Sequence, residues 1–319
     1  MGIVFRAQEG VASNGLRVLS MSRGLRAAAA FAAVFAVCGR IPAAQAITLA
    51  SSARQLPPGS LKLSLYYQGL QNQHLDFQVG SAGPCAGGGT VNPAFPCGSS
   101  GDVPARLDGG AVIFQAAAQP WEGLQYYASA GLGTASMGAS NNWMSGDRPG
   151  FLYGAGAKAV LLPDTIVSPG VALDGRLGWE RYYFNELQPA GTRSQAFVNE
   201  QLDIWRYQLA LEVSHQFNAR ESRSEAAGKE PLASAMNAGR AVLDTLGELR
   251  FEPYGGVKWL RSRAVLKDFQ DGRRLGGIQD SFAPFLGLMV PVYDHEGLFG
   301  EVSFVNGAQY AMGLNVRFK

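Results

Sequence analysis

The chain has 319 residues, of which 16% are charged and 41 are glycine, and its formal net charge is only +2. Nothing in this near-neutral balance suggests binding to nucleic acid, for which a strongly basic domain is typical. No apolar run reaches the roughly 20 residues of a membrane-spanning helix. Sparse charge with abundant glycine is typical of closely packed, curved strands with a large apolar exterior.

The segment Met21–Ala46 has the organisation of an export signal. Two arginines precede an apolar stretch from Ala27 to Val37, and Ala44-Gln45-Ala46 forms a small-residue cleavage site. The apolar stretch is too short to cross a bilayer as a helix. We therefore expect residues 1–46 to be removed as a signal peptide region, with Met21 as an alternative start that N-terminal sequencing of the precursor would test.

Residues 1–46 contain five arginines and one glutamate, so the mature chain would carry 22 basic and 24 acidic residues. Two cysteines remain in it, Cys85 and Cys97. Export favours an oxidising compartment, so we expect a disulfide between them. Two sulfurs without a nearby histidine fall short of the four ligands that zinc requires, so neither a metal nor a cofactor is expected.

The segment from Ala308 to Phe318 alternates apolar side chains with polar or small ones. Its apolar series is Tyr310, Met312, Leu314, Val316 and Phe318. Successive side chains of a strand point to opposite faces, so this segment predicts a strand with one apolar face. Similar alternation predicts strands over 61–70, 106–118, 124–136, 151–162, 171–184, 202–217, 248–262, 281–293, 298–305 and 308–318. About ten such strands behind an export signal predict a closed antiparallel transmembrane β-barrel with its apolar face in lipid, with 8 or 12 strands as alternatives.

The expected organisation is a flexible lead over 47–59 and one barrel domain over 60–319. Residues 219–246 form either a short helix at a barrel mouth or a disordered linker. Asn306-Gly307 is the strongest hairpin signal in the chain. It falls on the side where the other connections are long, so either the last hairpin is short or one strand has been divided in two.

With its signal, its repeated alternation and its closing YAMGLNVRF, the chain resembles the small outer-membrane β-barrel proteins of Gram-negative bacteria. The resemblance implies a place in the cell outer membrane, in contact with its lipid. It also implies that the outer-membrane assembly machinery recognises the last strand through the apolar series that ends at Phe318. Neither a ligand nor an oligomeric state follows from it.

Charged side chains recur on the face that would line the lumen. They are Lys62, Lys158, Asp174, Arg176, Glu180, Arg206, Glu212, Arg250, Glu252, Lys258, Glu301 and Arg317. Side chains can nearly fill a barrel of this size, and buried charges are unfavourable unless they are paired. These residues therefore favour a plug of ion pairs, and the small excess of bases leaves a narrow anion-attracting pore as the alternative.

Catalytic signals are weak. The chain has three histidines, His74, His215 and His295, and no serine lies near one of them in a nucleophile motif. The carboxylates Asp147, Glu186, Asp268 and Asp271 are expected in outer loops, and His74 near Asp76 is the best catalytic candidate, although a polar loop explains both. We therefore expect a non-enzymatic surface or envelope role, with at most limited permeability to small solutes. The alternatives are a narrow channel for small anions or polar solutes and a hydrolase acting on lipid or peptide.

Overall fold

The structure is a computed structural model that describes part of the chain. The described residues are Ala53 and residues 56–79, 101–165, 167–189, 191, 195–218, 250–270, 272–292, 295–304 and 307–318. The expected signal over 1–46, the cysteines Cys85 and Cys97, and the insertion at 219–246 lie outside this set. No helix among the described residues is long and apolar enough to cross a membrane.

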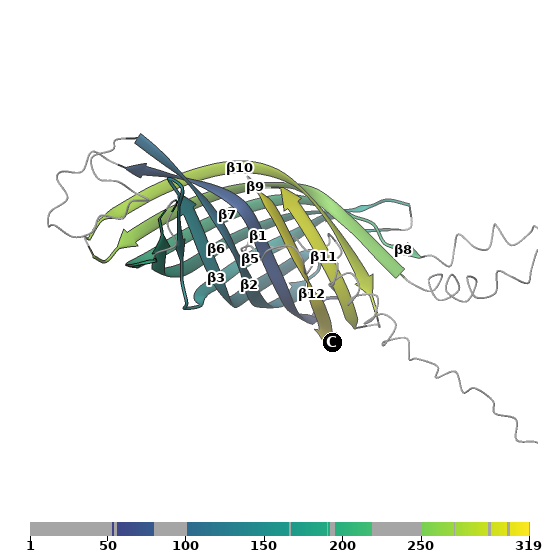
Figure 1. The fold of residues 1–319 in the computed structure, drawn as a ribbon. Helices are drawn as coiled ribbons and strands as arrows, with labels where there is room; N and C mark the ends of the chain where they lie inside the picture. Colours follow the sequence, from purple (N-terminus) through teal and green to yellow (C-terminus); the bar gives the residue numbers. More distant parts are fainter. Residues whose placement is uncertain are drawn as a thin grey trace, which may run out of the picture. The chain divides into compact units, whose positions relative to one another are not determined.

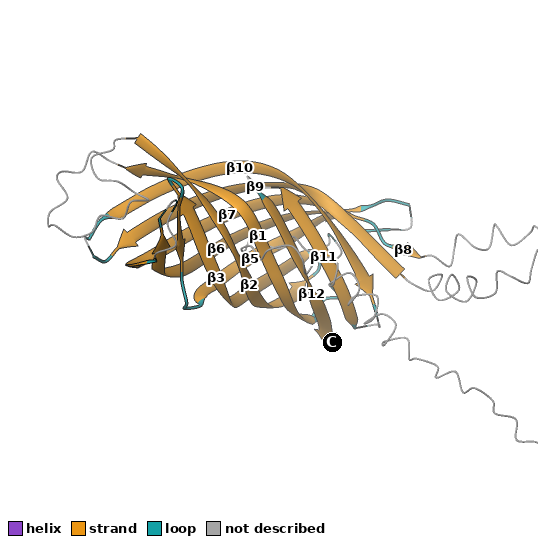
Figure 2. Cartoon of the chain, in the orientation of Figure 1, coloured by secondary structure: helices purple, strands orange, loops and turns teal. Residues whose placement is uncertain are grey.

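Strands and short connections make up nearly all of the described chain (Figure 1, Figure 2). The strands are β1 (Leu61–Val79), β2 (Gly101–Trp121), β3 (Leu124–Ala139), β4 (Asn142–Ser145), β5 (Gly150–Leu162), β6 (Gly170–Gln188), β7 (Ala196–Ser214), β8 (Phe217–Asn218), β9 (Arg250–Asp268), β10 (Arg274–Pro291), β11 (Glu296–Phe304) and β12 (Ala308–Phe318). All of their pairings are antiparallel.

The strands close into a ring because the last strand pairs with the first, from Leu61↔Phe318 to Gln71↔Ala308. β4 and β5 both lie between β3 and β6, so they share one position in the wall. β8 pairs only with β9. The ring therefore has ten positions, and the predicted closed antiparallel barrel is confirmed. We call the end that holds Leu61 and Phe318 the terminal end and the opposite end the distal end.

The ring narrows towards the distal end. The β11–β12 hairpin is short, and beyond it β1 pairs directly with β10 through Phe77↔Gly277. Gly307 in the hairpin lies against the backbone of Gln71 and Asn72, where β1 bulges and Asn72 adopts a φ of 55°. The distal wall thus runs β1-β2-β3-β4-β6-β7-β9-β10, two positions fewer than the terminal wall. This settles the question raised by Asn306-Gly307: the last hairpin is short, and no strand has been divided (Figure 1).

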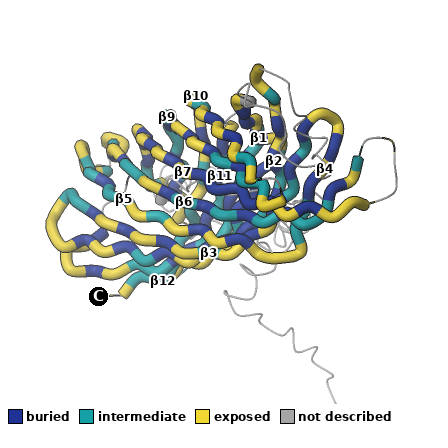
Figure 3. The backbone as a smooth tube through the Cα atoms, turned by 90° about the vertical axis from the view of Figure 1, so that its left-hand side faces the viewer, coloured by how far each residue is buried: buried dark blue, intermediate teal, exposed yellow. Residues whose placement is uncertain are grey.

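The polarity of the two faces reverses along the barrel. In the terminal half of β7, Leu209 and Leu211 are exposed outside while Glu212 is buried inside. In the distal half of β9, Leu266 is buried inside while Arg263 is exposed outside. The alternation of buried and exposed residues continues through both halves (Figure 3). The terminal half therefore has a polar interior and an apolar exterior, and the distal half has the opposite arrangement.

This reversal explains where the predicted strand boundaries were wrong. β1 continues to Val79 rather than ending at residue 70, and β9 and β10 extend through most of residues 263–280, which lie between two predicted strands. His74, Asp76 and Glu186 therefore lie on strands instead of in loops. The prediction required apolar residues on the outer face, and the distal strands carry polar residues there.

Gly146, in the connection between β4 and β5, packs against the wall without room for a side chain. A Cβ atom there would overlap the backbone carbonyl oxygen of Tyr183 on β6. We expect Gly146→Ala to lower the free energy of unfolding by about 1–3 kcal/mol because the backbone must shift. Urea titration would measure it, with Gly276→Ala as the control, since nothing lies within 4 Å of a Cβ at that position. Equal effects of the two substitutions would contradict this packing.

Candidate functional site

The interior of the terminal half gathers most of the charges that the sequence assigned to the lumen. Eight of them are buried: Lys158, Asp174, Glu180, Arg206, Glu212, Glu252, Lys258 and Glu301. Lys62, Arg176 and Arg317 are half-buried. The prediction that Arg250 lines the lumen is wrong, because Arg250 is exposed at the terminal end of β9. There β9 has extended past its ladder with β7 and pairs only with β8, through Asn218, so Arg250 does not line the lumen.

Lys158 on β5 is the centre of a buried acidic cluster. Its Nζ lies 2.5 Å from Glu212 Oε2 on β7 and 3.9 Å from Asp174 Oδ2 on β6. Tyr127 on β3 donates its hydroxyl hydrogen to Asp174 Oδ1. These four side chains come from four different strands, and the polar phase of each strand turns them inward. Their ion pairs and hydrogen bonds supply the compensation that buried charges need.

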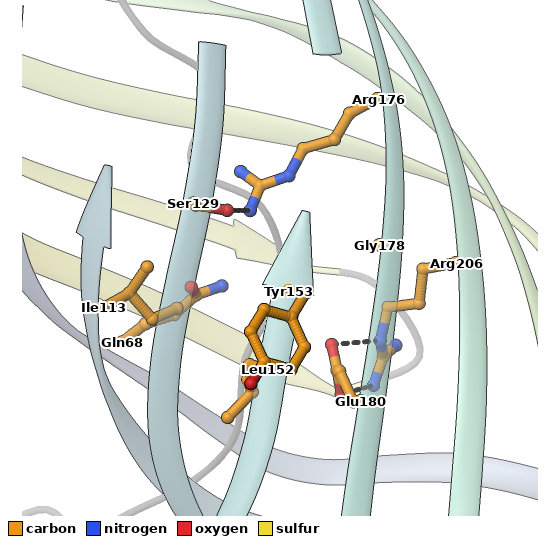
Figure 4. A pocket seen from close by; sticks show the side chains of 9 residues that line it. All are labelled: Gln68, Ile113, Ser129, Leu152, Tyr153, Arg176, Gly178, Glu180 and Arg206. Atoms are coloured by element: carbon orange, nitrogen blue, oxygen red, sulfur yellow. Dashed lines mark hydrogen bonds and ion pairs between the residues drawn. The ribbon is translucent and has the colours of Figure 1, made fainter. Parts of the chain in front are cut away.

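Arg206 on β7 forms a second network, which reaches across the lumen. Its Nε and Nη2 donate to the two carboxylate oxygens of Glu180 at 2.7 and 3.1 Å, a bidentate arrangement (Figure 4). Nη2 also donates to Gln73 Oε1 on β1 at 3.0 Å. Tyr182 donates to Glu180 Oε2 at 3.0 Å. Arg206 therefore ties β6 and β7 to the far side of the ring and fills the space between them.

A third ion pair joins Lys258 on β9 to Glu301 on β11. Lys258 Nζ also lies 4.6 Å from the centroid of the Phe285 ring, within the range of a cation–π contact. Both charged side chains are buried. Together the three networks neutralise most of the buried charge of the lumen.

A cavity of about 20 Å³, enough for about one water molecule, lies among these networks. Gln68, Ser129, Arg176, Glu180 and Arg206 contribute to its lining (Figure 4). Arg176 Nη2 donates to Ser129 Oγ at 2.8 Å. Within the described part of the chain, the side-chain amide of Gln68 has no hydrogen-bond partner, so a water molecule here would satisfy a buried polar group.

Beyond Arg206, towards the distal end, the interior becomes an apolar core, which we call the distal plug. Its larger members are Leu70, Leu75, Phe77, Leu107, Met137, Met144, Phe184, Leu187, Val198, Leu202, Ile204, Leu266 and Leu275. All eight strands of the distal wall contribute to it. This core was not predicted from the sequence. Its signal was present in β7, where Val198, Leu202 and Ile204 alternate with polar residues before Trp205.

The catalytic candidates are placed separately from this interior. His74 and Asp76 are exposed on the outer face of β1. His215 Nδ1 lies 2.8 Å from Asp164 Oδ1 near the terminal end, where Phe217 packs edge-on against the imidazole ring.

The remaining candidates are also dispersed. Asp147 is exposed between β4 and β5, Asp268 ends β9, and Glu186 Oε2 accepts a hydrogen bond from Ser145 at 3.4 Å. Asp271 lies outside the described residues. Within those residues, no group of three or more His, Cys, Asp or Glu side chains could hold a metal ion.

Comparison with solved structures finds similar chains. The translocator domain of autotransporter NalP from Neisseria meningitidis is 10% identical, with a TM-score of 0.42, over 93% of this chain and 97% of that one. The outer membrane protease OmpT from Escherichia coli is 9% identical, with a TM-score of 0.41, over 84% and 100%. The outer membrane protein OprG from Pseudomonas aeruginosa is 7% identical, with a TM-score of 0.37, over 84% and 99%.

No protein-family model and no curated protein matches the chain. The names of the three similar structures include a translocator domain and a protease, so the resemblance assigns no role to this chain.

Proposed function

We propose that the chain is an outer-membrane β-barrel whose terminal half crosses the lipid. The support is a band of large apolar side chains exposed around the outer face of that half. Its members include Leu65, Val112, Phe114, Leu132, Leu177, Leu209, Leu211, Val257, Phe282, Leu286 and Leu314. A continuous apolar surface of this extent is unfavourable in water and favourable against acyl chains. If the termini are taken as periplasmic, the distal half projects outward from the membrane.

We further propose that the barrel is a sealed, non-enzymatic scaffold that presents its distal exterior at the cell surface. The observation that carries this proposal is the distal plug, which caps a lumen already crossed by Arg206 and its partners. A dry apolar core opposes the passage of ions, because their hydration cannot be replaced there. On this view β12, whose alternate residues from Tyr310 to Phe318 face outward, would be the strand that the assembly machinery recognises.

A narrow channel for small anions or polar solutes is the second candidate. The half-buried Arg176 beside a water-sized cavity favours it, since a guanidinium group in a hydrated lumen attracts anions. Conduction would, however, require the plug to move. The two candidates therefore differ in whether the plug moves enough to let ions pass.

Recording from planar bilayers separates the two. We expect the reconstituted chain to give no stepwise conductance, because the apolar core closes the ring. Insertion is checked in parallel by protection of the strands from protease. Conductance steps that change their ion selectivity in the Arg176→Glu variant would overturn the sealed scaffold in favour of the channel.

A further inference from the structure

The apolar band ends in a row of aromatic rings on β5, β6 and β7. The Tyr153 and Trp179 rings stack with centroids 5.8 Å apart, and Trp179 and Trp205 lie 6.3 Å apart. All three point outward, and Tyr153 and Trp205 are exposed. Amphipathic rings concentrate where hydrocarbon meets the polar headgroups. This row therefore marks the distal edge of the lipid on this side of the barrel.

Basic side chains begin at this row and continue distally. Arg263 is the cross-strand neighbour of Trp205, and Arg261 that of Tyr207. Arg181 lies one outward position beyond Trp179, and Lys267 pairs in register with Arg274. We call these five residues the basic collar.

The acidic residues among them leave the collar with a positive excess. Asp203 is held by Arg181 at 2.7 Å and by Lys267 at 2.6 Å. Asp280 lies 3.5 Å from Arg261. Within the described residues, the exposed Arg263 and Arg274 take part in no ion pair. Two guanidinium groups, that of Arg263 beside the aromatic row and that of Arg274 four positions further toward the distal end, are thus available to an external anion.

The next two strands along the ring, β1 and β2, have the reverse charge, and β1 pairs directly with β10 at this end. At the same distal level the outer faces of β1 and β2 carry Asp76, Asp102 and Asp108 against a single Arg106. Excess positive charge is therefore confined to one sector, β6 to β10. Positive charge spread evenly around the rim would not indicate a binding site. A cluster on one sector, next to the aromatic row, is the geometry of a binding surface.

We propose that the basic collar binds the phosphate-bearing headgroup of a lipid in the distal leaflet, an inference that rests on the proposed membrane span. Guanidinium groups bind phosphate oxygens in bidentate fashion. The acyl chains of the same molecule would lie on Leu177, Leu209 and Phe282, directly below the collar. Phosphate and acyl chain are thus matched by two adjoining surfaces, which a free phosphate ion could not use together.

The test uses the full chain in phosphatidylcholine vesicles doped with diphosphoryl lipid A, and measures which lipid the extracted protein retains by native mass spectrometry. We expect the unmodified chain to retain lipid A preferentially. The R263Q/R274Q variant should retain it about tenfold less, because it loses two charge-assisted contacts. The control is R106Q, an exposed arginine outside the collar, which should retain as much as the unmodified chain.

Four other results would overturn the inference. Equal retention by R263Q/R274Q and R106Q would show that the collar does not select the lipid. Displacement of lipid A by inorganic phosphate alone would identify a site for soluble anions. Failure of the chain to insert into pure phosphatidylcholine vesicles would remove the membrane span itself, whereas insertion without lipid preference would remove only this inference.

Discussion

Replacing Lys158 with methionine is expected to lower the free energy of unfolding by about 3–5 kcal/mol. Lys158 is fully buried, and its ammonium group is the cation between Glu212 and Asp174. Without it, two carboxylates remain close together in an interior that water reaches poorly. Reversible urea unfolding in phospholipid vesicles, followed by tryptophan fluorescence, would measure the loss.

A double-mutant cycle separates the ion pair from packing. Glu212→Gln alone should destabilise the barrel, and the K158M/E212Q double variant should lose less than the sum of the two single variants, because neither charge is then left without its partner. Arg106→Gln supplies the control for a charge exposed on the outer face, and it should change stability by less than about 0.5 kcal/mol. A loss for K158M as small as that control would show that water reaches the cluster.

The terminal half of the barrel could be predicted from sequence because two signals agree there. Alternation gives a strand, and apolar residues on one phase identify the face in lipid. In β12 both signals persist from Ala308 to Phe318, and the predicted and observed bounds coincide. The ring closure between β12 and β1 followed from the same pattern, since a sheet in lipid leaves no open edge.

The distal half could not be predicted in this way because its apolar residues change phase. In β7 the outward positions carry Asn199, Gln201 and Asp203 and then Trp205, while the apolar residues before Trp205 point inward. A rule that places apolar residues outside reads such a segment as a polar loop. In β1 the bulge near Asn72 also shifts the alternation by one residue. Which residues face outward after the bulge therefore does not follow from the alternation before it.

The lumen was predictable by residue type, but its partners were not. Charges on the polar phase identify Arg206 and Glu180 as inward, yet their pairing depends on the register between β6 and β7. The contact from Arg206 to Gln73 spans 133 positions in the sequence. Gln73 was also expected in a loop, because β1 was predicted to end at residue 70. Networks across a lumen depend on ring closure, which is a property of the whole sheet.

The distal plug predicts a second large effect, at Leu202. Leu202→Ala is expected to lower the free energy of unfolding by about 2–5 kcal/mol, the range for a leucine whose removal leaves a cavity in a packed core. Leu202 is 0% exposed and belongs to the apolar cluster that fills the distal interior. The same urea titration measures this loss of stability. The dependence of the unfolding free energy on urea concentration shows whether the variant exposes the same surface on unfolding as the unmodified chain.

Leu209→Ala is the matched control, with the same substitution in the same strand on the opposite face. Leu209 is 45% exposed on the apolar band, where acyl chains can move into the space that the side chain leaves. No cavity then persists, so its loss should stay below about 1 kcal/mol. A small loss at both positions would mean that the distal interior is loosely packed or wet, and the sealed scaffold would give way to a channel. A large loss at both would place Leu209 in a protein core and contradict the lipid-facing band. Packed protein cannot fill the cavity that the substitution leaves, whereas acyl chains can.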